Sequence, residues 1–261
     1  MTVGLPEYTS ASQLKTYAMC PRKYALRYLD DAEPEDKGPS LVVGSVVHSA
    51  IGWFFETRLA EREPTIDEAL DVVHADFAAA IDGPPVRWGR WTQADLLEHT
   101  GNLVRFFLEE EGDLVVADVE ERHQVELHHP VTGEALPRPL LCYLDFRVDG
   151  DDVVELKTSR SPYSEASIGS NLQFGAYAAV LDELGAGSLA VWVVIKNKRP
   201  RLQKLKVQRN PLRERWFFDA AMAIEEAIAA GHFPPAPGWT CATCEYRRRC
   251  LGTVQADARA A

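Results

Sequence analysis

The stretch YLDFRVDGDDVVELKTS (143–159) combines two apolar strand patterns with charged residues at fixed positions. Asp145 lies in the first predicted strand and Glu155 in the second, and the polar residues between them predict a hairpin at 149–152. Because side chains alternate along a strand, Glu155 and Lys157 share a face, and the hairpin brings Asp145 beside them. We therefore expect these three charged side chains to meet in one sheet.

This set of side chains has a chemical and a structural interpretation. Two carboxylates on adjacent strands suit a hard divalent cation such as Mg²⁺, and a neighbouring lysine can position or deprotonate water for metal-assisted phosphodiester hydrolysis. The alternative is a solvated hairpin face, because acidic residues near lysines are common. Val153, Val154 and Leu156 favour the chemical interpretation. They indicate a buried strand, where charges need a partner or a metal ion.

Outside this stretch, helical patterns precede most of the strand patterns. Helices are predicted at 10–29 (with a break at Cys20-Pro21), 44–62, 66–81, 92–111, 165–184 and 211–230. Strands are predicted within 114–129, 140–150, 152–159, 188–197 and 202–208. We expect an α/β fold with a mixed central sheet flanked by helices and an N-terminal helical insertion. One domain, 1–261, would comprise a helical part (10–112), a core sheet (113–210) and a C-terminal helix and tail (211–261).

The composition excludes several classes of protein. A hydrophobic fraction of 46% and a charged fraction of 26% are ordinary for a globular chain, so disorder is not expected. The apolar run LAVWVVI (189–195) is too short to span a bilayer. Residues 1–19 lack a basic start followed by an apolar core, so we expect no secretion signal and a cytoplasmic location.

Positive charge is concentrated in one segment, although the net charge is −11. The segment KNKRPRLQKLKVQRNPLRER (196–215) contains nine Lys and Arg residues and one Glu. A basic segment on an acidic body is compatible with a local phosphate-binding surface, and equally with a solvated strand and helix start. The candidate nucleic-acid contacts in it are Lys198, Arg199, Arg201, Lys204 and Lys206.

Five marks in one order resemble the PD-(D/E)XK nuclease superfamily, and within it the RecB/AddB-type exonucleases and their CRISPR-associated relatives. The marks are Cys20-Pro21, Gly44 with His48, Asp145 with Glu155-Leu156-Lys157, Gln173 with Tyr177, and the C-x2-C-x5-C tail. They cover roughly residues 10–250. Two positions depart from the family pattern, because Leu144 stands where a proline is usual and Cys142 where a glycine is common. Glu120 or Glu121 resembles a family glutamate, but we assign it no role.

The resemblance implies a restriction-endonuclease-like fold and a metal-dependent deoxyribonuclease, an exonuclease on single strands or DNA ends. It implies that Asp145 and Glu155 bind Mg²⁺ or Mn²⁺, with His48 as a further ligand. Lys157 would orient or activate water, and Gln173 and Tyr177 would position the lysine, a metal-bound water or the DNA. On sequence alone, His48 is more simply explained as a hydrogen-bonded core residue.

Five cysteines allow a four-ligand site. Cys142 lies in the predicted active-site strand and is expected to be a buried free thiol. The others are Cys20, Cys241, Cys244 and Cys250. The resemblance implies a [4Fe–4S] cluster on these four, which would join the two ends of the chain into a cysteine-clasped tail. A four-cysteine zinc site is the alternative, and disulfides are the least favoured in a reducing compartment.

The expected partner is DNA, with a possible protein partner in repair, recombination or CRISPR adaptation, and no membrane. One alternative function is a non-catalytic or partner-activated subunit that binds DNA ends. The complete Asp, Glu and Lys set argues against it, because a purely structural copy needs none of the three. A second alternative, a zinc-stapled hydrolase of another kind, rests only on the ambiguity of the metal.

Overall fold

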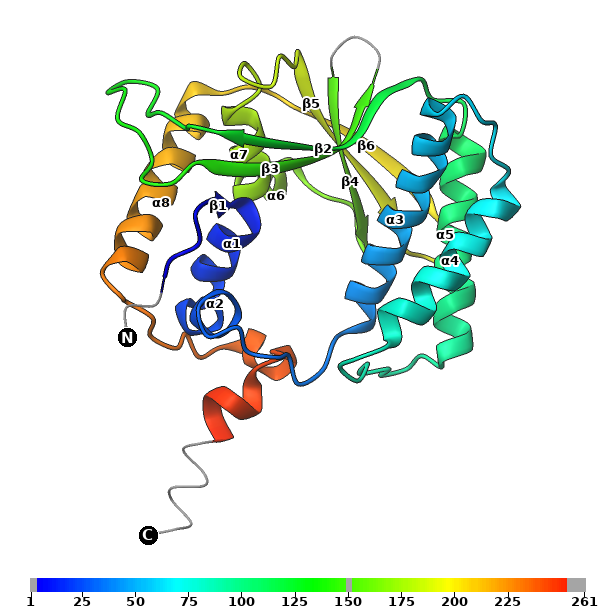
Figure 1. The fold of residues 1–261 in the computed structure, drawn as a ribbon, viewed down its shortest axis with the longest axis horizontal. Coiled ribbons are helices and arrows are strands. Elements are labelled where there is room, and N and C mark those ends of the chain that lie inside the picture. Colours follow the sequence, from blue (N-terminus) through cyan, green and yellow to red (C-terminus); the bar gives the residue numbers. More distant parts are fainter. Residues whose placement is uncertain (1–3, 149–151, 253–261) are drawn as a thin grey trace.

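A mixed sheet lies between two groups of helices in the computed structural model, which describes residues 4–148 and 152–252 (Figure 1). The strands are β1 (Thr9–Ser10), β2 (Val116–Val125), β3 (Leu140–Val148), β4 (Asp152–Ser159), β5 (Ser188–Ile195) and β6 (Arg201–Val207). Of the hairpin predicted at 149–152, residues 149–151 lie outside the described residues, and Asp152 begins β4. The expected mixed α/β architecture of the restriction-endonuclease type is confirmed.

Strands β3 and β4 are neighbours in the sheet, but they pair over only a short stretch and have diverged where the charged residues lie. The sheet runs β1-β3-β4-β5-β6, and β2 pairs with the other edge of β3. β4 and β5 are parallel, whereas β3 pairs antiparallel with β4 only from Phe146 to Val148. Asp145 is the first residue of β3 beyond this short pairing. The divergence leaves backbone groups of β4 free to bond to side chains.

Helices cover both faces of the sheet (Figure 1). The helices are α1 (Ala11–Met19), α2 (Pro21–Tyr28), α3 (Pro39–Leu59), α4 (Ile66–Ile81), α5 (Gln93–Glu111), α6 (Glu165–Gly169), α7 (Leu172–Ala179) and α8 (Pro211–Ala229). One core joins α3, α4 and α5 to the sheet, and the other joins α1, α7 and α8 to its opposite face. None of the helices in the described ranges is long and apolar enough to cross a membrane.

Strand β5 is covered by helices on both faces of the sheet. From Val191 to Ile195 every side chain is buried, as expected for such a strand. Each fully buried valine or leucine contributes about 1.5–3 kcal/mol of transfer free energy. The near-continuous apolar run in the sequence therefore reflects a strand that lies between β4 and β6 and contributes to both cores.

Caps set the helix boundaries, and one predicted helix is divided. Thr65 and Glu68 form a capping box at the start of α4. An N-cap of this kind stabilises a helix by about 1 kcal/mol. The single helix predicted at 165–184 is wrong: it is two short helices, α6 and α7, separated at Ser170. The cause is Asn171, whose side chain accepts a hydrogen bond from the backbone N–H of Gln173 at 2.9 Å and starts a new helix.

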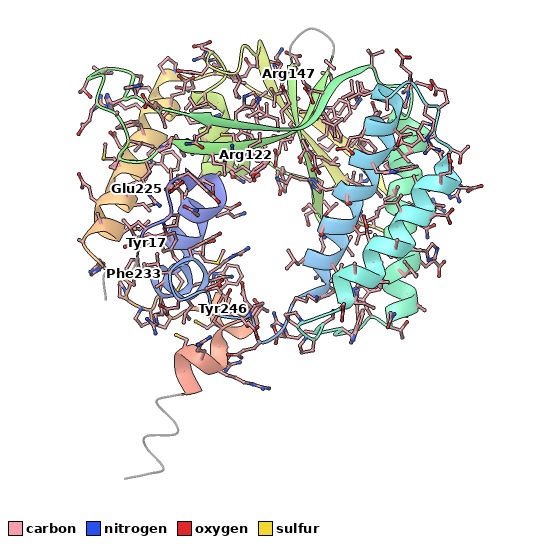
Figure 2. All side chains as sticks on the ribbon, in the orientation of Figure 1. Tyr17, Arg122, Arg147, Glu225, Phe233 and Tyr246 are labelled. Atoms are coloured by element: carbon pink, nitrogen blue, oxygen red, sulfur yellow. The ribbon has the colours of Figure 1, made fainter. Side chains whose placement is uncertain are left out.

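A buried ion pair ties the start of β3 to α8. The guanidinium of Arg138 donates two hydrogen bonds to Glu225, at 2.7 and 2.8 Å, and also donates to the carbonyls of Pro6 and Tyr8. The side chain of Glu225 is only 2% exposed. This residue of α8 is labelled in Figure 2. One guanidinium thus holds the N-terminal segment, β3 and α8 in a fixed arrangement.

Candidate active site

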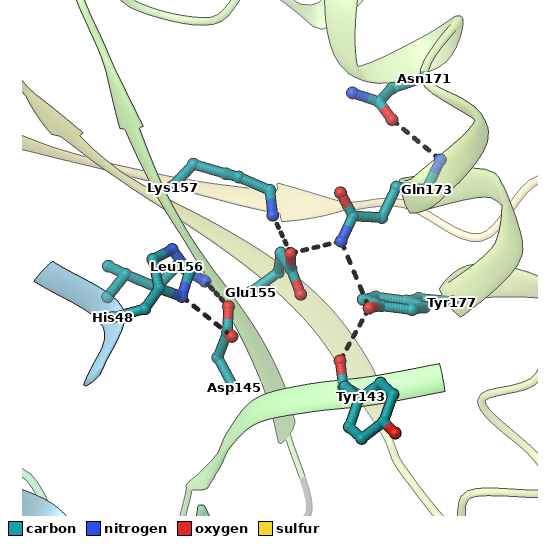
Figure 3. A network of polar contacts seen from close by, with 9 residues as sticks. All are labelled: His48, Tyr143, Asp145, Glu155, Leu156, Lys157, Asn171, Gln173 and Tyr177. Atoms are coloured by element: carbon teal, nitrogen blue, oxygen red, sulfur yellow. Dashed lines mark hydrogen bonds and ion pairs between the residues drawn. The ribbon is translucent and has the colours of Figure 1, made fainter. Parts of the chain in front are cut away.

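Four elements bring the predicted catalytic residues together where β3 and β4 diverge (Figure 3). β3 supplies Asp145, and β4 supplies Glu155 and Lys157. Helix α3 brings His48 from one side, and α7 brings Gln173 and Tyr177 from the other. Residues separated by more than a hundred positions in the chain therefore form one polar network inside the fold.

Asp145 is held by two donors. Its Oδ2 accepts the backbone N–H of Leu156 at 2.7 Å, and its Oδ1 lies 3.1 Å from His48 Nδ1. Burial raises the pKa of Asp145, but the charges of His48 and Lys157 and these hydrogen bonds outweigh it and lower the pKa overall. Asp145 is therefore a carboxylate, and it in turn raises the pKa of His48 against the effect of burial.

Glu155 has one paired and one unpaired oxygen. Its Oε1 accepts from Lys157 Nζ and, at 2.6 Å, from Gln173 Nε2. Its Oε2 is buried with no hydrogen-bond partner in the described part of the chain, and the side chain is only 2% exposed. Burial and the charge of Asp145 raise the pKa of Glu155 to about 7, against the opposing effect of Lys157. An orphaned carboxylate oxygen beside a second carboxylate needs a cation or a proton.

Gln173 and Tyr177 connect the carboxylate of Glu155 to the backbone of β3. Gln173 Nε2 lies 3.3 Å from the Tyr177 hydroxyl, which donates to the carbonyl of Tyr143 at 2.7 Å. Burial raises the pKa of Tyr177 well above its ordinary value, so the hydroxyl keeps its proton and remains a donor. These two residues therefore fix the position of Glu155 relative to β3.

The donor set fits a hard divalent cation. Such ions take carboxylate oxygens, and Glu155 Oε2 is an oxygen without another partner. Within residues 4–148 and 152–252, no group of three or more His, Cys, Asp or Glu side chains is arranged closely enough to hold a metal ion. At this site, Asp145 Oδ2 accepts from the backbone N–H of Leu156 and Glu155 Oε1 accepts from Lys157 Nζ, so these two oxygens point toward protein donors and not toward a shared ion. Asp145 and Glu155 would hold the cation through their carboxylates, and Glu155 Oε2 is the oxygen that has no protein partner in the described residues.

Two further charged residues lie at the site, and neither was predicted to have a role there. Glu120 in β2 has a positive φ of 52°, and burial together with Glu56 and Asp145 raises its pKa. A non-glycine residue with positive φ is strained, and such strain is common at functional sites. Lys15 in α1 has its pKa lowered by partial burial and by the charge of Lys157. The similarity of Glu120 to a family glutamate is a sequence signal for that residue, whereas we identified no such signal for Lys15.

The predicted basic residues are not gathered at this site. In β6, Lys204 pairs with Trp192 and Lys206 with Ala190, which places both on the α5 side of the sheet. Lys204 contacts Glu111 at 2.7 Å and lies over the Trp192 ring at 3.9 Å. Lys198 and Arg199 lie in the connection after β5, and Arg201 begins β6. Glu155 and Lys157 face the opposite side, beside Val191 and Val193.

Other cations converge beside the site instead. A small recess near the first turn of α3 is lined by Arg90, His99, Arg160 and Lys196, and none of its lining residues is acidic. Burial, followed by the charge of Arg160, lowers the pKa of Lys196 to about 8. Like charges that depress each other in this way favour an anion. Arg160 follows β4 directly, so the recess lies at the same end of the sheet as Lys157.

The four candidate ligand cysteines lie where the two ends of the chain meet. Cys20 joins α1 to α2, and the other three lie on the short helical turns at Trp239–Thr243 and Arg248–Gly252 and between them. All four are half-buried and free. Burial, and then the charge of Cys20, raises the pKa of Cys250, as expected for neighbouring thiols. Thiols are the ligands that iron–sulfur clusters and zinc prefer, although these four are not arranged closely enough in the described structure to hold a metal ion.

Contacts other than the cysteines also hold the two ends together. Lys23 in α2 pairs with Glu245 at 2.8 Å, and Glu35 accepts hydrogen bonds from the backbone N–H groups of Arg248 and Arg249. The ring centroids of Tyr17 and Phe233 lie 6.2 Å apart, with one ring edge-on to the other. Both residues are labelled in Figure 2. The arrangement expected of a clasp is therefore present in the protein contacts themselves.

Cys142 differs from the other cysteines and should not react in the folded protein. It is buried in β3, and burial raises its pKa to about 12, so at pH 8 its reactive thiolate fraction is about 10⁻⁴. We expect native iodoacetamide treatment at pH 8 in the presence of a chelator to spare Cys142, while the half-buried Cys241 is alkylated. Peptide mapping checks this, with urea-unfolded protein as the control. Equal native labelling of the two cysteines would contradict the burial of Cys142.

Comparison with known proteins identifies the family. The model of the PD-(D/E)XK nuclease superfamily matches residues 8–251. The chain belongs to the PD-(D/E)XK nuclease superfamily. The nuclease activity expected from the sequence is thereby confirmed at the level of the superfamily. No curated protein is similar to the chain in sequence.

A solved structure shares the fold of this nuclease, and a second one is similar over less of its geometry. The crystal structure of a "putative exonuclease" from Eubacterium rectale is 16% identical, with a TM-score of 0.57, covering 93% of this chain and 88% of that one. The crystal structure of SSO0001 is 15% identical, with a TM-score of 0.35, covering 90% of this chain and 92% of that one. At 16% identity the first similarity establishes a common fold.

Proposed function

We propose that this nuclease is a metal-dependent deoxyribonuclease, an exonuclease that removes nucleotides from single strands or DNA ends. The observation that carries the proposal is the buried, unpartnered Glu155 Oε2 next to the carboxylate of Asp145 and the ammonium of Lys157. A single domain over 1–261 in the cytoplasm, acting in repair, recombination or CRISPR adaptation, is part of the same proposal. The name of the Eubacterium rectale structure that shares the fold, a "putative exonuclease", is in line with the choice of activity.

Each residue of the network has a role in this proposal. Asp145 and Glu155 would hold Mg²⁺ or Mn²⁺, with His48 as a further ligand. The bound ion would supply Lewis-acid activation of the phosphodiester and of water. Although burial opposes its charge, the carboxylates of Glu155 and Asp145 raise the pKa of Lys157, so it acts as a cation that orients water and stabilises phosphate charge. Gln173 and Tyr177 keep Glu155 in position.

The phosphates of the strand require positive charge along its path. Arg160 and Lys196 provide this charge next to the active site, and Lys198, Arg199, Arg201, Lys204 and Lys206 would extend it along the edge of the sheet. Binding through phosphates releases counterions and weakens as salt rises. Of these cations, Lys204 contributes least in this proposal, because it is already paired with Glu111.

A [4Fe–4S] cluster on Cys20, Cys241, Cys244 and Cys250 is the cofactor we propose for the clasp, with zinc as the alternative. The soft thiol set and the convergence of the two chain ends support it. Elemental analysis and the visible spectrum of protein prepared without oxygen separate the two. Iron with absorption near 400 nm is expected, whereas stoichiometric zinc in a colourless protein would favour the alternative.

The activity is tested with linear and circular DNA of one sequence. We expect the protein with Mn²⁺ to release nucleotides from 5′- or 3′-labelled linear single strands, and to leave a covalently closed circle intact because it lacks an end. The order in which the two labels appear in products gives the polarity. Cutting of the circle at the rate of the linear strand would contradict an exonuclease, and no cutting of either substrate would contradict a nuclease.

Removing the amide of Gln173 tests the positioning role. Gln173→Ala loses the 2.6 Å hydrogen bond to Glu155, and we expect activity at limiting Mn²⁺ to fall about 10–100-fold, as is typical when an outer partner of a metal ligand is lost. The decrease should shrink at saturating Mn²⁺, because metal affinity is what changes. Gln203→Ala, whose amide contacts Tyr163, is the matched control. Equal losses at both metal concentrations would contradict the positioning role.

A further inference from the structure

A pocket of 180 Å³ opens beside the active site and has no role in the account above. It lies between the start of α1, the end of α2, the first half of β3 and α7. Gln173 and Tyr177 form part of its wall, and the same two residues hold Glu155 on their other side. A group in the pocket is therefore one pair of side chains away from the carboxylates.

Aromatic rings dominate the pocket. Four tyrosines line it: Tyr8, Tyr28, Tyr143 and Tyr177. Tyr143 is 53% exposed although it stands in the middle of β3, while Tyr8 and Tyr28 are half-buried. Exposed tyrosine rings beside a nucleic-acid site are stacking surfaces, because every base has a π-face that an aromatic ring can cover.

A buried amide lines the same pocket. Gln13 in α1 is 4% exposed, and its Oε1 is buried without a hydrogen-bond partner in the described part of the chain. Leaving an amide oxygen unpaired is unfavourable, because water would satisfy it in the unfolded chain. An N–H donor that enters the pocket would remove this penalty.

The geometry points to a nucleobase-binding pocket: the tyrosines stack on one base of the substrate strand, and Gln13 hydrogen-bonds to the edge of that base. This inference rests on the proposed function, since it places the base next to the phosphodiester at Glu155 and Lys157. The aromatic walls fit the flat faces of a base, and the amide fits its polar edge. The recess at Arg160 and Lys196 would remain for phosphate.

Gln13 also implies a preference among bases. Its side-chain oxygen accepts a hydrogen bond from an amino group, and a glutamine amide can pair with adenine through two hydrogen bonds. Thymine also has a donor, its ring N3–H, so the base to compare is unsubstituted purine (deoxynebularine), which has no N–H donor. We expect adenine in the pocket to be bound about three- to tenfold more tightly than purine, the typical effect of one net hydrogen bond.

The test is equilibrium binding of labelled single-stranded oligonucleotides in EDTA, measured by anisotropy, with one abasic site moved through successive positions. For the wild-type protein we expect one position at which the missing base weakens binding roughly tenfold. Tyr143→Ala and Gln13→Met should reduce that positional effect, and Gln13→Met should abolish the preference for adenine over purine there. Trp216→Ala, which removes an exposed ring on α8 outside the pocket, is the control and should keep both.

Circular dichroism is the control for folding, and each variant should give the spectrum of the wild-type protein. An equal effect of the abasic site at every position, or the same positional effect in Tyr143→Ala as in the wild type, would overturn the inference. The cleavage assay with Mn²⁺ is independent of this measurement. A strand that is bound with the positional effect but never cut would refute the proposed function alone, and a strand that is cut without the effect would refute the pocket alone.

Discussion

Replacing Lys157 by methionine should lower DNA cleavage by about 10³-fold or more while the protein stays folded. Lys157 is the ammonium that contacts Glu155 beside Asp145, and methionine keeps most of its length without the charge. The loss follows because Lys157 is the ammonium in contact with Glu155, where it can orient water and stabilise the phosphate. Initial rates on a labelled single strand with saturating Mn²⁺ measure it.

Two controls make this result specific. Arg105→Met removes an exposed cation on α5, whose contact with Asp67 is 3.4 Å, and should keep the wild-type rate. Equilibrium binding of the strand in EDTA should change less than threefold in Lys157→Met, because binding uses many phosphate contacts. A variant without Lys157 that cuts at a wild-type rate would remove the lysine from the mechanism.

Replacing Glu225 by alanine should destabilise the protein by about 3–5 kcal/mol, because it leaves the Arg138 guanidinium buried without its carboxylate. Arg138 also holds the carbonyls of Pro6 and Tyr8, so the N-terminal segment and α1 should loosen together. Chemical unfolding with urea, followed by circular dichroism, measures the change in the free energy of unfolding.

Matched variants separate burial from pairing in this experiment. Arg138→Met with Glu225→Leu replaces both charges by apolar groups, and we expect a smaller loss than Glu225→Ala alone. Arg215→Ala removes an exposed pair with Asp219 at 3.7 Å and should change stability by less than about 1 kcal/mol. Equal effects of Glu225→Ala and Arg215→Ala would show that the buried pair is not structurally important.

The residues that form local patterns made most of the fold predictable. The alternation in VVELK puts Glu155 and Lys157 on one face, and the capped pattern at 66–81 is α4. The helix at 165–184 was mispredicted because its apolar pattern continues through Asn171, whose side-chain cap restarts the helix. The pairing of Arg138 with Glu225 joins residues 87 positions apart, which no local pattern indicates.

The site was predictable as a set of residues but not as an arrangement. His48, Asp145 and Glu155 could be chosen because they resemble a family motif, whereas their hydrogen bonds depend on where β3 leaves β4. Lys196 and Arg160 belong to the ends of two neighbouring strands, and only the sheet shows that they meet. Gln13 carries no sequence signal at all, since its importance comes from an unpaired oxygen inside a pocket.

The most direct test of the central claim is the metal dependence of cleavage by one protein preparation. The preparation is dialysed against EDTA, divided, and supplied with Mn²⁺, Mg²⁺ or buffer before the addition of a labelled single strand. We expect nucleotide release with Mn²⁺ or Mg²⁺ and none with buffer, and we expect Glu155→Gln to release none in any sample, because the amide cannot provide the second carboxylate. Equal release with and without the cation, or release by Glu155→Gln at the wild-type rate, would contradict a metal-dependent nuclease at this site.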